Sequence, residues 1–431
     1  MHSLSDARDK DISSAKKRRR AVVATVLGNS LEWFDFAVYA FFAAIIAKNF
    51  FSTEDSSTAL LKTFAVFGVG FIARPLGAIV FGLIGDKFGR KLALMIAMPM
   101  MGAGTLLVGL SPNYEQIGVF AAVLLVLGRL IQGFSAGGEL GNAVAFLIEW
   151  SPANQRAFYS GFQQSSVILG TLTGSALAAL ISGLLPAEDV ESWGWRIPFL
   201  IGGLVIAPIG FFIRAKVEET PIFLQSHKKE VASTKPQESP WKVGVKVIFT
   251  TASWIVAYYI FLIFMPSFLQ KHAAFSQEHS LWASTCGLLA MMLSIPLWGK
   301  VSDKIGRKPP YFIAALFFAV VTYPAFSWML ENPTLPNAII VSVVAGFVLG
   351  IFAGIGPALM AEMFSTSSRT TGVSVSFGLA SAIIGGFAPF FSTWLIEQTG
   401  NPLSATYNVI IFSIVSFITL FFVKETFRNE L

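Results

Sequence analysis

The sequence predicts an all-α membrane protein in which twelve spanning helices form two pseudo-symmetric six-helix bundles. Hydrophobic residues make up 54% of the 431 residues and charged residues only 13%, whereas about a quarter of the residues of a soluble domain are charged. Apolar runs long enough to cross a bilayer recur along the chain. Two basic stretches between such runs, Gly85–Lys91 and Ser302–Lys308, are nearly the same, which indicates a duplication.

A bilayer span needs about 20 apolar residues, and twelve segments meet this requirement. They are residues 21–47, 60–85, 92–110, 117–149, 157–185, 196–214, 244–270, 280–300, 310–330, 336–361, 370–396 and 403–423. The first segment follows a polar, basic N-terminus, residues 1–20. It is longer than the apolar core of a cleavable signal peptide, so we expect it to remain as a span.

The distribution of Lys and Arg predicts the orientation. If the N-terminus is cytoplasmic, 25 of the 31 basic residues lie in cytoplasmic segments. Cytoplasmic loops carry such an excess. We therefore expect a protein of the cell inner membrane with both termini, including residues 424–431, on the cytoplasmic side. The pI of about 9.3 would also suit a nucleic-acid-binding protein, but the placement of the charges beside spans argues against that class.

The two halves match beyond the repeated loop. Residues 215–243 are the longest polar insertion and read as a cytoplasmic linker between bundles at 21–214 and 244–423. Three pairs of glycines recur at an offset of 213 residues, namely Gly133, Gly137 and Gly141 with Gly346, Gly350 and Gly354. Small residues at this spacing let two helix backbones approach closely. Repeated halves of this kind are typical of secondary transporters, whose sites lie at the seam.

Ionisable groups inside a bilayer are costly and are by default functional. Far from span ends the sequence has five, all in the first half: Glu32, Asp35, Arg74, Arg129 and Glu139. With a rise of about 1.5 Å per residue, Glu32, Arg74 and Arg129 each lie about 16 Å from a span end. They are therefore predicted to converge near the midplane of the membrane.

The charges of these five groups favour a reversibly protonated carboxyl. Two arginines cannot be neutralised by losing a proton, and three acids face them. We expect Glu32 or Asp35 to carry the proton, with Glu139 as a further coupling acid. The alternative, in which all five form static ion pairs that hold the helices together, stays open, as does a simple pair between Arg129 and Glu139.

Guanidinium groups suit carboxylate ligands, so Arg74 and Arg129 are predicted to bind an anionic substrate. Asn29 and Tyr39 lie on the same helix face as Glu32 and are expected to line the same cavity. Further candidates are polar or aromatic residues in the fifth and seventh spans: Gln163, Tyr258 and Tyr259. Each of them alternatively serves only in packing or at the interface.

The short loops supply a second set of candidates, for gating. Asp86 and Asp303 end the second and eighth spans, and each is expected to pair with the positive N-terminus of a helix in the opposite half. The remaining predicted gating residues are Arg90, Glu149, Arg156, Arg307, Glu362 and Arg369. The alternative is that they only cap turns and set topology.

The sequence lacks motifs that other functional classes of protein require. The sequence has no paired histidines at metal spacing and no phosphate-binding loop, so neither an enzyme nor an ATP-driven pump is expected. No metal and no cofactor is expected, and protons are the predicted coupling ion. A passive channel or a solute sensor remains an alternative.

Four motifs resemble the metabolite:proton symporter branch of the major facilitator superfamily. They are GNSLEWFDF at residues 28–36, RPLG at 74–77, RLIQGFSAGGE at 129–139 and WGWRIPF at 193–199. The repeated loops are similar to the signature of the superfamily. The resemblance implies two six-helix bundles, alternating access and proton-coupled import, with the acids of the first span and the arginines of the second and fourth spans in the polar core. Gln132, within the third motif, is a further expected substrate-binding residue.

Members of that branch carry citrate, 2-oxoglutarate, shikimate, proline or betaine. From the two arginines we expect import of a di- or tricarboxylate such as citrate. The alternatives are proton symport of a zwitterion such as betaine or proline, and proton-driven export of a drug or metabolite. The expected partners are this small-molecule substrate and the lipid bilayer, without nucleic acid, and the protein is expected to function as a monomer.

Overall fold

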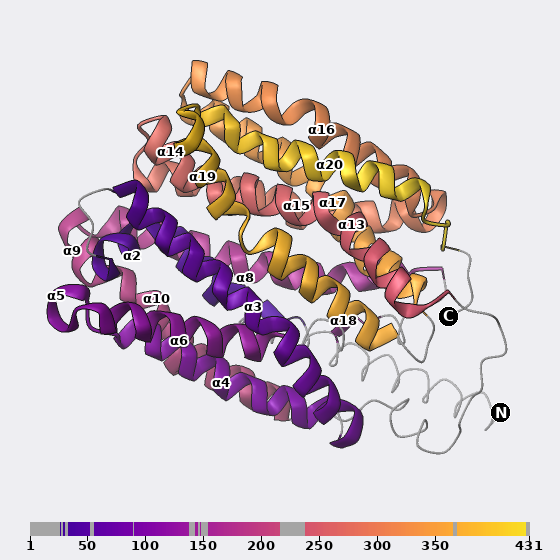
Figure 1. The fold of residues 1–431 in the computed structure, drawn as a ribbon, viewed down its shortest axis with the longest axis horizontal. Helices are drawn as coiled ribbons and strands as arrows, with labels where there is room; N and C mark the ends of the chain where they lie inside the picture. Colours follow the sequence, from indigo (N-terminus) through magenta and orange to yellow (C-terminus); the bar gives the residue numbers. More distant parts are fainter. Residues whose placement is uncertain are drawn as a thin grey trace, which may run out of the picture.

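The computed structural model of the chain describes residues 33–51, 56–88, 90–137, 154–215, 238–364 and 369–427, with residues 26, 29, 30, 143, 144 and 147. In these residues the regular secondary structure is helical, and they contain no strand. The all-α fold class is therefore confirmed. In Figure 1 the helices of the first half, indigo to magenta, lie on one side, and those of the second half, pink to yellow, lie on the other.

The first half begins with a helix at Trp33–Phe41. The helices that follow are α2 (Ala43–Phe50), α3 (Ser56–Phe88), α4 (Arg90–Leu110), α5 (Tyr114–Ile117), α6 (Val119–Ala136), α8 (Arg156–Leu184), α9 (Ala187–Ser192), η1 (Gly194–Arg196), α10 (Ile197–Ile201), η2 (Gly202–Ile206) and α11 (Ala207–Ala215). Within this half α6 packs against both α3 and α4, and α4 packs against η2 and α11.

The second half repeats the pattern. Its helices are α13 (Pro240–Tyr258), η3 (Tyr259–Phe264), α14 (Met265–His272), α15 (Gln277–Ile305), α16 (Lys308–Glu331), α17 (Leu335–Met363), α18 (Arg369–Ala380), η4 (Ser381–Gly385), α19 (Ala388–Thr399), η5 (Pro402–Ser404) and α20 (Ala405–Phe421). The two halves meet where α8 packs against α15 and α17, and where α3 packs against α18 and η4.

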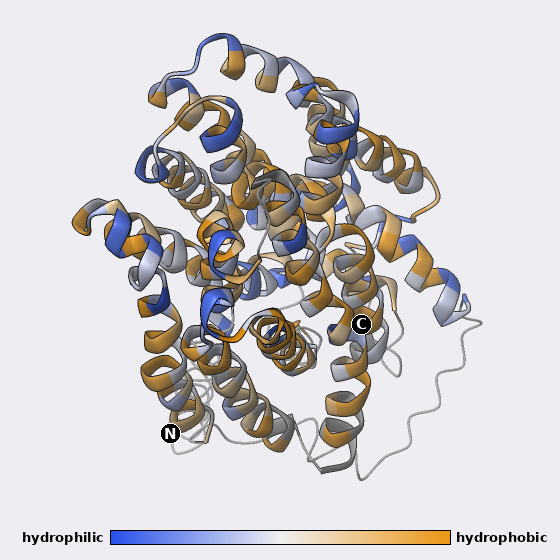
Figure 2. Cartoon of the chain, turned by 60° about the vertical axis from the view of Figure 1, so that its left-hand side comes forward, coloured by the Kyte–Doolittle hydropathy of each residue, from blue (hydrophilic) through white to orange (hydrophobic). Residues whose placement is uncertain are grey.

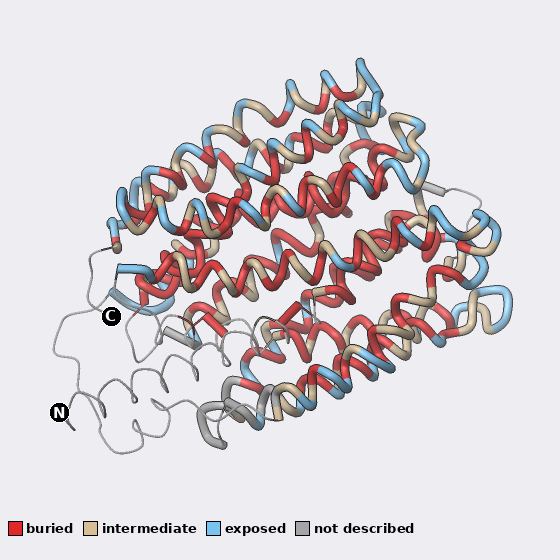
Figure 3. The backbone as a smooth tube through the Cα atoms, turned by 180° about the vertical axis from the view of Figure 1, so that it is seen from behind, coloured by how far each residue is buried: buried red, intermediate tan, exposed pale blue. Residues whose placement is uncertain are grey.

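Each of the twelve predicted spans corresponds to helical structure. Of the described helices, ten are long and apolar enough to cross a membrane, and the bent pair Trp33–Phe41 and Ala43–Phe50 makes an eleventh. The span predicted at 92–110 is α4, whose apolar part, Met95–Leu110, is shorter. Large apolar side chains are exposed on the outside, among them Phe212, Val320 and Phe421, as expected for a surface in contact with lipid. Figure 2 shows hydrophobic residues along most of the helices, and Figure 3 shows buried residues on their inner faces.

Two helices of the second half begin three or four residues earlier than predicted. The seventh span begins at Pro240 rather than at residue 244, because proline is well accommodated at the first helical position. The eighth begins at Gln277 rather than at residue 280, because the Ser276 side chain accepts a hydrogen bond from the His279 amide and caps the helix. The predicted linker 215–243 falls largely outside the described residues, so the division into two domains stays a prediction.

Two predicted spans are not continuous α-helices. The first changes direction by 69° between Trp33–Phe41 and Ala43–Phe50. The seventh widens into a π-helix, η3, just before Pro266. Proline has no amide hydrogen, so the carbonyl four residues earlier loses its helical partner. In this chain that carbonyl belongs to Leu262, and the Ser284 hydroxyl of α15 donates a hydrogen bond to it.

The glycine ladders bring helix backbones into direct contact. A Cβ atom at Gly133 would overlap the carbonyl oxygen of Gly70 in α3, and one at Gly346 would overlap that of Gly287 in α15. The same ladder positions in the two halves therefore pack α6 against α3 and α17 against α15. Gly141 of the first ladder lies outside the described residues.

Alanine at Gly346 is expected to destabilise the protein by more than the roughly 1–3 kcal/mol typical of core overpacking, because backbone rather than a side chain must move. The measurement is the melting temperature of purified protein in detergent. Gly378 in α18 is the matched control, since a Cβ there meets no atom within 4 Å. Alanine at Gly378 is expected to be neutral or stabilising. Equal effects of the two variants would contradict the packing argument.

Candidate functional site

Asp35 is the centre of a buried hydrogen-bond network between three helices. The side chain, on helix Trp33–Phe41, is 2% exposed. Its Oδ2 atom accepts hydrogen bonds from the Thr105 hydroxyl of α4 and from the Gln132 amide of α6. The amide oxygen of Gln132 in turn accepts from Nη1 of Arg129 at 2.8 Å. Gln132 therefore connects the carboxyl of Asp35 to the guanidinium of Arg129.

The second oxygen of Asp35 is different. Oδ1 is buried and has no hydrogen-bond partner among the described residues. A buried carboxylate oxygen without a donor is costly, and that cost falls if the oxygen carries a proton or contacts water. The arrangement thus gives Asp35 one oxygen fixed by protein donors and one oxygen that is suited to proton exchange.

Arg129 is fully buried among aromatic rings. Its Cζ atom lies 4.3 Å from the ring centroid of Phe36, 4.5 Å from that of Tyr39 and 5.4 Å from that of Phe67. Nε and Nη2 of Arg129 have no hydrogen-bond partner within the described part of the chain. The aromatic faces stabilise the cation, while two N–H donors remain available for a carboxylate.

Arg74 of α3 lies on the same aromatic cluster. Its Cζ atom is 4.5 Å from the centroid of Phe36, 4.1 Å from that of Phe71 and 4.8 Å from that of Trp33. The structure thus brings both predicted arginines against one ring, that of Phe36. The aromatic residues Phe67 and Phe71 were not singled out from the sequence, although their spacing of four and the nearby Arg74 place all three along one helix.

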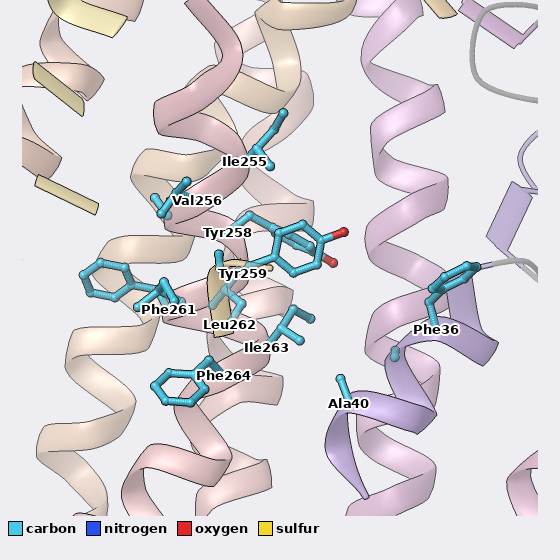
Figure 4. Close-up of a cluster of buried hydrophobic side chains, with 14 of the residues drawn as sticks. Phe36, Ala40, Ile255, Val256, Tyr258, Tyr259, Phe261, Leu262, Ile263 and Phe264 are labelled. Carbon is cyan, nitrogen blue, oxygen red and sulfur yellow. The ribbon is translucent and has the colours of Figure 1, made fainter. Parts of the chain in front are cut away.

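The second half contributes the two tyrosines at the junction of α13 and η3. Tyr258 shares a hydrogen bond of 2.9 Å with Thr171 of α8. The ring of Tyr259 packs edge-on against Phe67 and Phe71, with centroid distances of 6.0 and 5.7 Å. Figure 4 shows both tyrosine side chains extending from their helix toward the side on which Phe36 lies. The aromatic cluster therefore spans the seam between the halves.

Other predicted substrate residues are engaged in packing. The Asn29 amide donates to the Ser166 hydroxyl at 2.7 Å and to the Gln163 carbonyl at 3.3 Å, which attaches the first helix to α8. The Tyr39 hydroxyl donates to the Thr63 carbonyl at 3.2 Å, so its ring rather than its oxygen faces Arg129. Roles of these residues toward a substrate stay predictions.

Several predicted residues cannot be placed. Glu32, Glu139 and Glu149 lie outside the described residues, and so do the side chains of Asp86, Arg90 and Arg369. The expected pair of Arg129 with Glu139 and the choice between Glu32 and Asp35 are therefore not tested by the geometry. Asp35 is the predicted coupling acid whose surroundings are described.

A second polar cluster closes one end of the seam. The carboxylate of Asp303, near the end of α15, accepts hydrogen bonds from the backbone amides of Ala157 and Phe158 at 3.2 and 3.1 Å. These amides open α8 in the opposite half, next to Arg156, the first residue of that helix. The contact has the geometry that a latch across the seam requires, while the gating role stays a prediction.

Arg307 holds Asp303 in place. It forms an ion pair with Asp303 at 2.8 Å, and its Nε and Nη2 donate to the two carboxylate oxygens of Glu362 at 3.1 and 2.9 Å. Burial alone would lower the pKa of Arg307, but the hydrogen bonds and charges of Glu362 and Asp303 raise it above its usual value. The arginine therefore stays charged in this cluster.

Sequence reasoning missed the C-terminal part of this cluster. The carboxylate of Glu425 accepts hydrogen bonds from the backbone amides of Arg307 and Lys308 at 2.9 and 3.0 Å. The Thr426 hydroxyl donates to Glu362 at 2.7 Å. The available signal was weak: an acidic residue just beyond the last span, with no spacing that points to the loop near residue 307.

Comparison with known proteins identifies the family. The family model for sugar (and other) transporters matches residues 21–243, and the model for the major facilitator superfamily matches residues 274–430. The chain belongs to the major facilitator superfamily. The expected family is therefore confirmed, and the protein is a multi-pass membrane transporter.

The relatives and the solved structures of this superfamily agree on the fold. The chain is 33% identical to the proline/betaine transporter of Escherichia coli (strain K12), over 98% of this chain and 87% of that relative. Identity to the proline/betaine transporter of Salmonella typhimurium is also 33%, over 96% and 85%. The partially occluded, inward-open xylose transporter XylE from E. coli superposes with a TM-score of 0.78 at 18% identity, covering 96% of this chain and 100% of that chain. At this identity the structural likeness concerns the fold alone.

These relatives fit the expected metabolite:proton symporter branch but not the expected substrate. Their names refer to proline and betaine, which are zwitterions with one carboxylate, and not to citrate or another di- or tricarboxylate. The expectation of a di- or tricarboxylate finds no support in them. They favour the zwitterion alternative.

Asparagine at Asp303 is expected to loosen the latch of this facilitator. The amide group lacks the charge that stabilises a helix N-terminus, and loss of such a cap costs about 1 kcal/mol. Backbone hydrogen exchange at Ala157 and Phe158, measured by mass spectrometry, is therefore expected to become about five- to tenfold faster. Glu331→Gln at the end of α16 is the control, because Glu331 is an exposed acid bonded only within its own helix. Unchanged exchange in Asp303→Asn would contradict the latch.

Proposed function

We propose that the protein is a proton-coupled secondary transporter that imports a compact zwitterion of the betaine or proline class by alternating access. The observation that carries the proposal is the position of Arg129, whose two available N–H donors lie within an aromatic cluster that spans the seam. The named relatives support the same substrate class. Import and the inner membrane are part of the proposal, and so are the cytoplasmic termini, which rest on the charge asymmetry of the loops.

The carboxylate of the substrate binds Arg129. A guanidinium group presents parallel N–H donors that match the two oxygens of a carboxylate. Nε and Nη2 of Arg129 form one such pair of donors, which fits one carboxylate of a ligand. The other buried guanidinium of this cluster, that of Arg74, lies against the rings of Phe36 and Phe71. A tricarboxylate would require further cations, and the buried charged residues described in the second half, Arg307 and Glu362, lie in the latch instead.

The cationic end of the substrate lies against the tyrosines of the second half. Quaternary and secondary ammonium groups bind well to the faces of aromatic rings. Tyr258 and Tyr259 are adjacent, with centroids 5.3 Å apart, and Tyr259 contacts the Phe67 and Phe71 rings of the first half. A ligand held between Arg129 and these tyrosines joins the two halves, which is the contact that alternating access requires.

Protonation of Asp35 favours substrate binding in this arrangement. While Asp35 is ionised, its negative charge polarises the Gln132 amide that bridges it to Arg129 and stabilises the positive charge of Arg129. When Asp35 takes a proton, Arg129 loses this anionic neighbour and its charge is available to a substrate carboxylate. Each binding event therefore promotes the other, and a coupling of this kind is reciprocal.

The test is a ligand panel on purified protein. Betaine, proline, citrate, 2-oxoglutarate and succinate are compared by thermal shift in detergent at acidic and neutral pH. Betaine or proline is expected to raise the melting temperature, more strongly at acidic pH, because a ligand stabilises the state that it binds. Stabilisation by citrate or another carboxylate, without an effect of either zwitterion, would overturn the proposed substrate class.

The mode of transport needs a second measurement. Proteoliposomes loaded with the stabilising ligand are expected to show counterflow exchange, which a channel does not support. A pH-sensitive dye trapped in the vesicles is expected to report acidification during uptake. Alkalinisation of the interior during uptake would indicate the export alternative, in which substrate and proton move in opposite directions.

A further inference from the structure

A small cavity lies behind Asp35, inside the first half and on the α4 side of the first helix. Its volume is about 10 Å³, close to the space that one water molecule needs. The walls come from helix Trp33–Phe41, α4, η2 and α11. The lining residues are Asp35, Met98, Met101, Gly102, Thr105, Gly202, Ile206 and Ala207.

We propose that one water molecule in this cavity exchanges protons with Asp35, so that protons reach the carboxyl between α4 and η2, on a route separate from that of the substrate. The proposal deepens the proposed function and rests on it for the role of Asp35 in coupling. In the exchange, a hydronium ion that enters from solvent transfers one proton to Oδ1 and remains in the cavity as a neutral water molecule. The reverse transfer restores the carboxylate.

The unpartnered oxygen of Asp35 faces this cavity. A Cβ atom built on Gly202 would lie 3.4 Å from Oδ1 of Asp35, which places the oxygen opposite η2. A buried water needs two or more polar partners. Oδ1 is one, and the Thr105 hydroxyl at the cavity wall is the other. Its proton bonds to Asp35 or to the Met101 carbonyl, and its oxygen accepts from Gln132 at 3.2 Å, so one lone pair remains for a water molecule.

The side of the Asp35 carboxyl that faces Arg129 is blocked by hydrogen-bonded side chains. Oδ2 is occupied by the donors Thr105 and Gln132, and Gln132 stands between it and Arg129 in the aromatic cluster. A proton approaching from the substrate side would have to pass this hydrogen-bonded amide and the cation beside it. The cavity side instead brings Oδ1 next to small and flexible residues.

The cavity wall consists of close-packed glycines, a π-helix and flexible side chains. A Cβ at Gly102 would lie 2.7 Å from that of Ala207, and one at Gly202 would lie 3.1 Å from Thr105, so these glycines let α4 approach η2 and α11 closely. The π-helix η2 is a feature often found at functional sites. Met98 and Met101, both almost fully buried, have unbranched side chains that change shape at low cost. Ile206 and Ala207 form the far wall, and Ile206 is partly exposed on the outer side of η2.

Among the described residues, the charged and titratable groups around Asp35 lie on the other side of it. From α6, Arg129 faces it through Gln132, and from α3, Arg74 lies beyond the Phe36 ring. Tyr39 is on its own helix, with its hydroxyl bonded to α3. The cavity residues from α4, η2 and α11 carry no titratable group. The proton at Oδ1 is therefore exchanged with water rather than with a neighbouring side chain.

The experiment adds one methyl group to the cavity. Gly202→Ala places a Cβ 3.4 Å from Oδ1 of Asp35, and its closest contact is 3.1 Å from Thr105. Gly174→Ala in α8 is the matched control, because its Cβ meets the same first helix from another side, at 3.0 Å from the Phe34 carbonyl. If Gly202→Ala fails to fold, Ala207→Val narrows the same cavity from its far wall.

The measurement is infrared spectroscopy of the protein without substrate. The carboxyl band that disappears in Asp35→Asn is identified at acidic pH, and its shift is followed after transfer from H2O to D2O. Gly202→Ala is expected to slow this shift about tenfold, the size expected when a buried oxygen loses its polar partner, while Gly174→Ala leaves it unchanged. Equal rates in both variants, or the absence of any band removed by Asp35→Asn, would overturn the proposal. Since no substrate is used, a failure here is distinct from a failure of the ligand panel.

Discussion

Asparagine in place of Asp35 is expected to abolish proton-driven accumulation of the substrate while leaving counterflow exchange intact. The amide is nearly isosteric with the carboxyl and keeps an oxygen that accepts from Thr105 and Gln132, but it cannot bind or release a proton. A gradient of one pH unit corresponds to about 1.4 kcal/mol per proton, which supports about tenfold accumulation by the coupled protein. The variant is expected to reach no more than equal concentrations on both sides.

The measurement uses proteoliposomes with an imposed pH gradient, followed by counterflow in the same preparation without a gradient. Asp189→Asn is the control, since Asp189 lies in the short helix α9, where it interacts with Trp193, away from the aromatic cluster. Retention of the gradient-driven accumulation in Asp35→Asn would assign coupling to another acid, and Glu32 is the remaining candidate in the same span.

The fold could be predicted from the sequence because the bilayer imposes strong rules. Apolar length defines spans, and loop charge and the repeated loops define two related halves. The length of an apolar run does not determine where a helix bends or changes its hydrogen-bonding pattern. The bend after Phe41 and the π-helix at Tyr259–Phe264 depend on tertiary contacts, such as that of Ser284 with the Leu262 carbonyl.

The sequence singled out the charged residues of the described cluster and some neutral ones, such as Gln132 and Tyr259, but not Thr105 or Phe67. Asp35 and Arg129 stand out because an ionisable group in an apolar span is rare. Thr105 and Phe67 do not stand out, because hydroxyls and phenylalanines are common in spans. Which of them faces Asp35 or Arg129 is determined by how helices far apart in the sequence pack together.

The sequence led us to expect a di- or tricarboxylate, whereas the relatives favour the zwitterion alternative. Two arginines in the sequence indicated two carboxylate contacts. In the structure Arg129 is linked through Gln132 to Asp35, and both guanidinium groups contact the ring of Phe36. Both arginines therefore lie on one aromatic cluster, and this arrangement supports the proposed ligand with one carboxylate and one cation.

Lysine in place of Arg129 is expected to weaken substrate binding about ten- to a hundredfold, although the charge is preserved. Hydrogen bonds to a charged group contribute about 1.5–3 kcal/mol, and an ammonium group can neither form a bidentate contact with a carboxylate nor stack its plane on Phe36 and Tyr39. The measurement is the ligand concentration that half-saturates the thermal shift. The loss is expected in affinity rather than in the melting temperature of the free protein.

Arg196→Lys provides a matched control for this experiment. Arg196 also lies over an aromatic ring, with Cζ 4.5 Å from the Trp195 centroid, but its Nη1 donates to the carbonyls of Gly109 and Ser111. Its substitution is therefore expected to lower the melting temperature of the free protein without changing ligand affinity. If Arg129→Lys instead lowers stability and keeps affinity, then Arg129 is a structural cation whose available donors contact no substrate, and recognition of the carboxylate passes to Arg74.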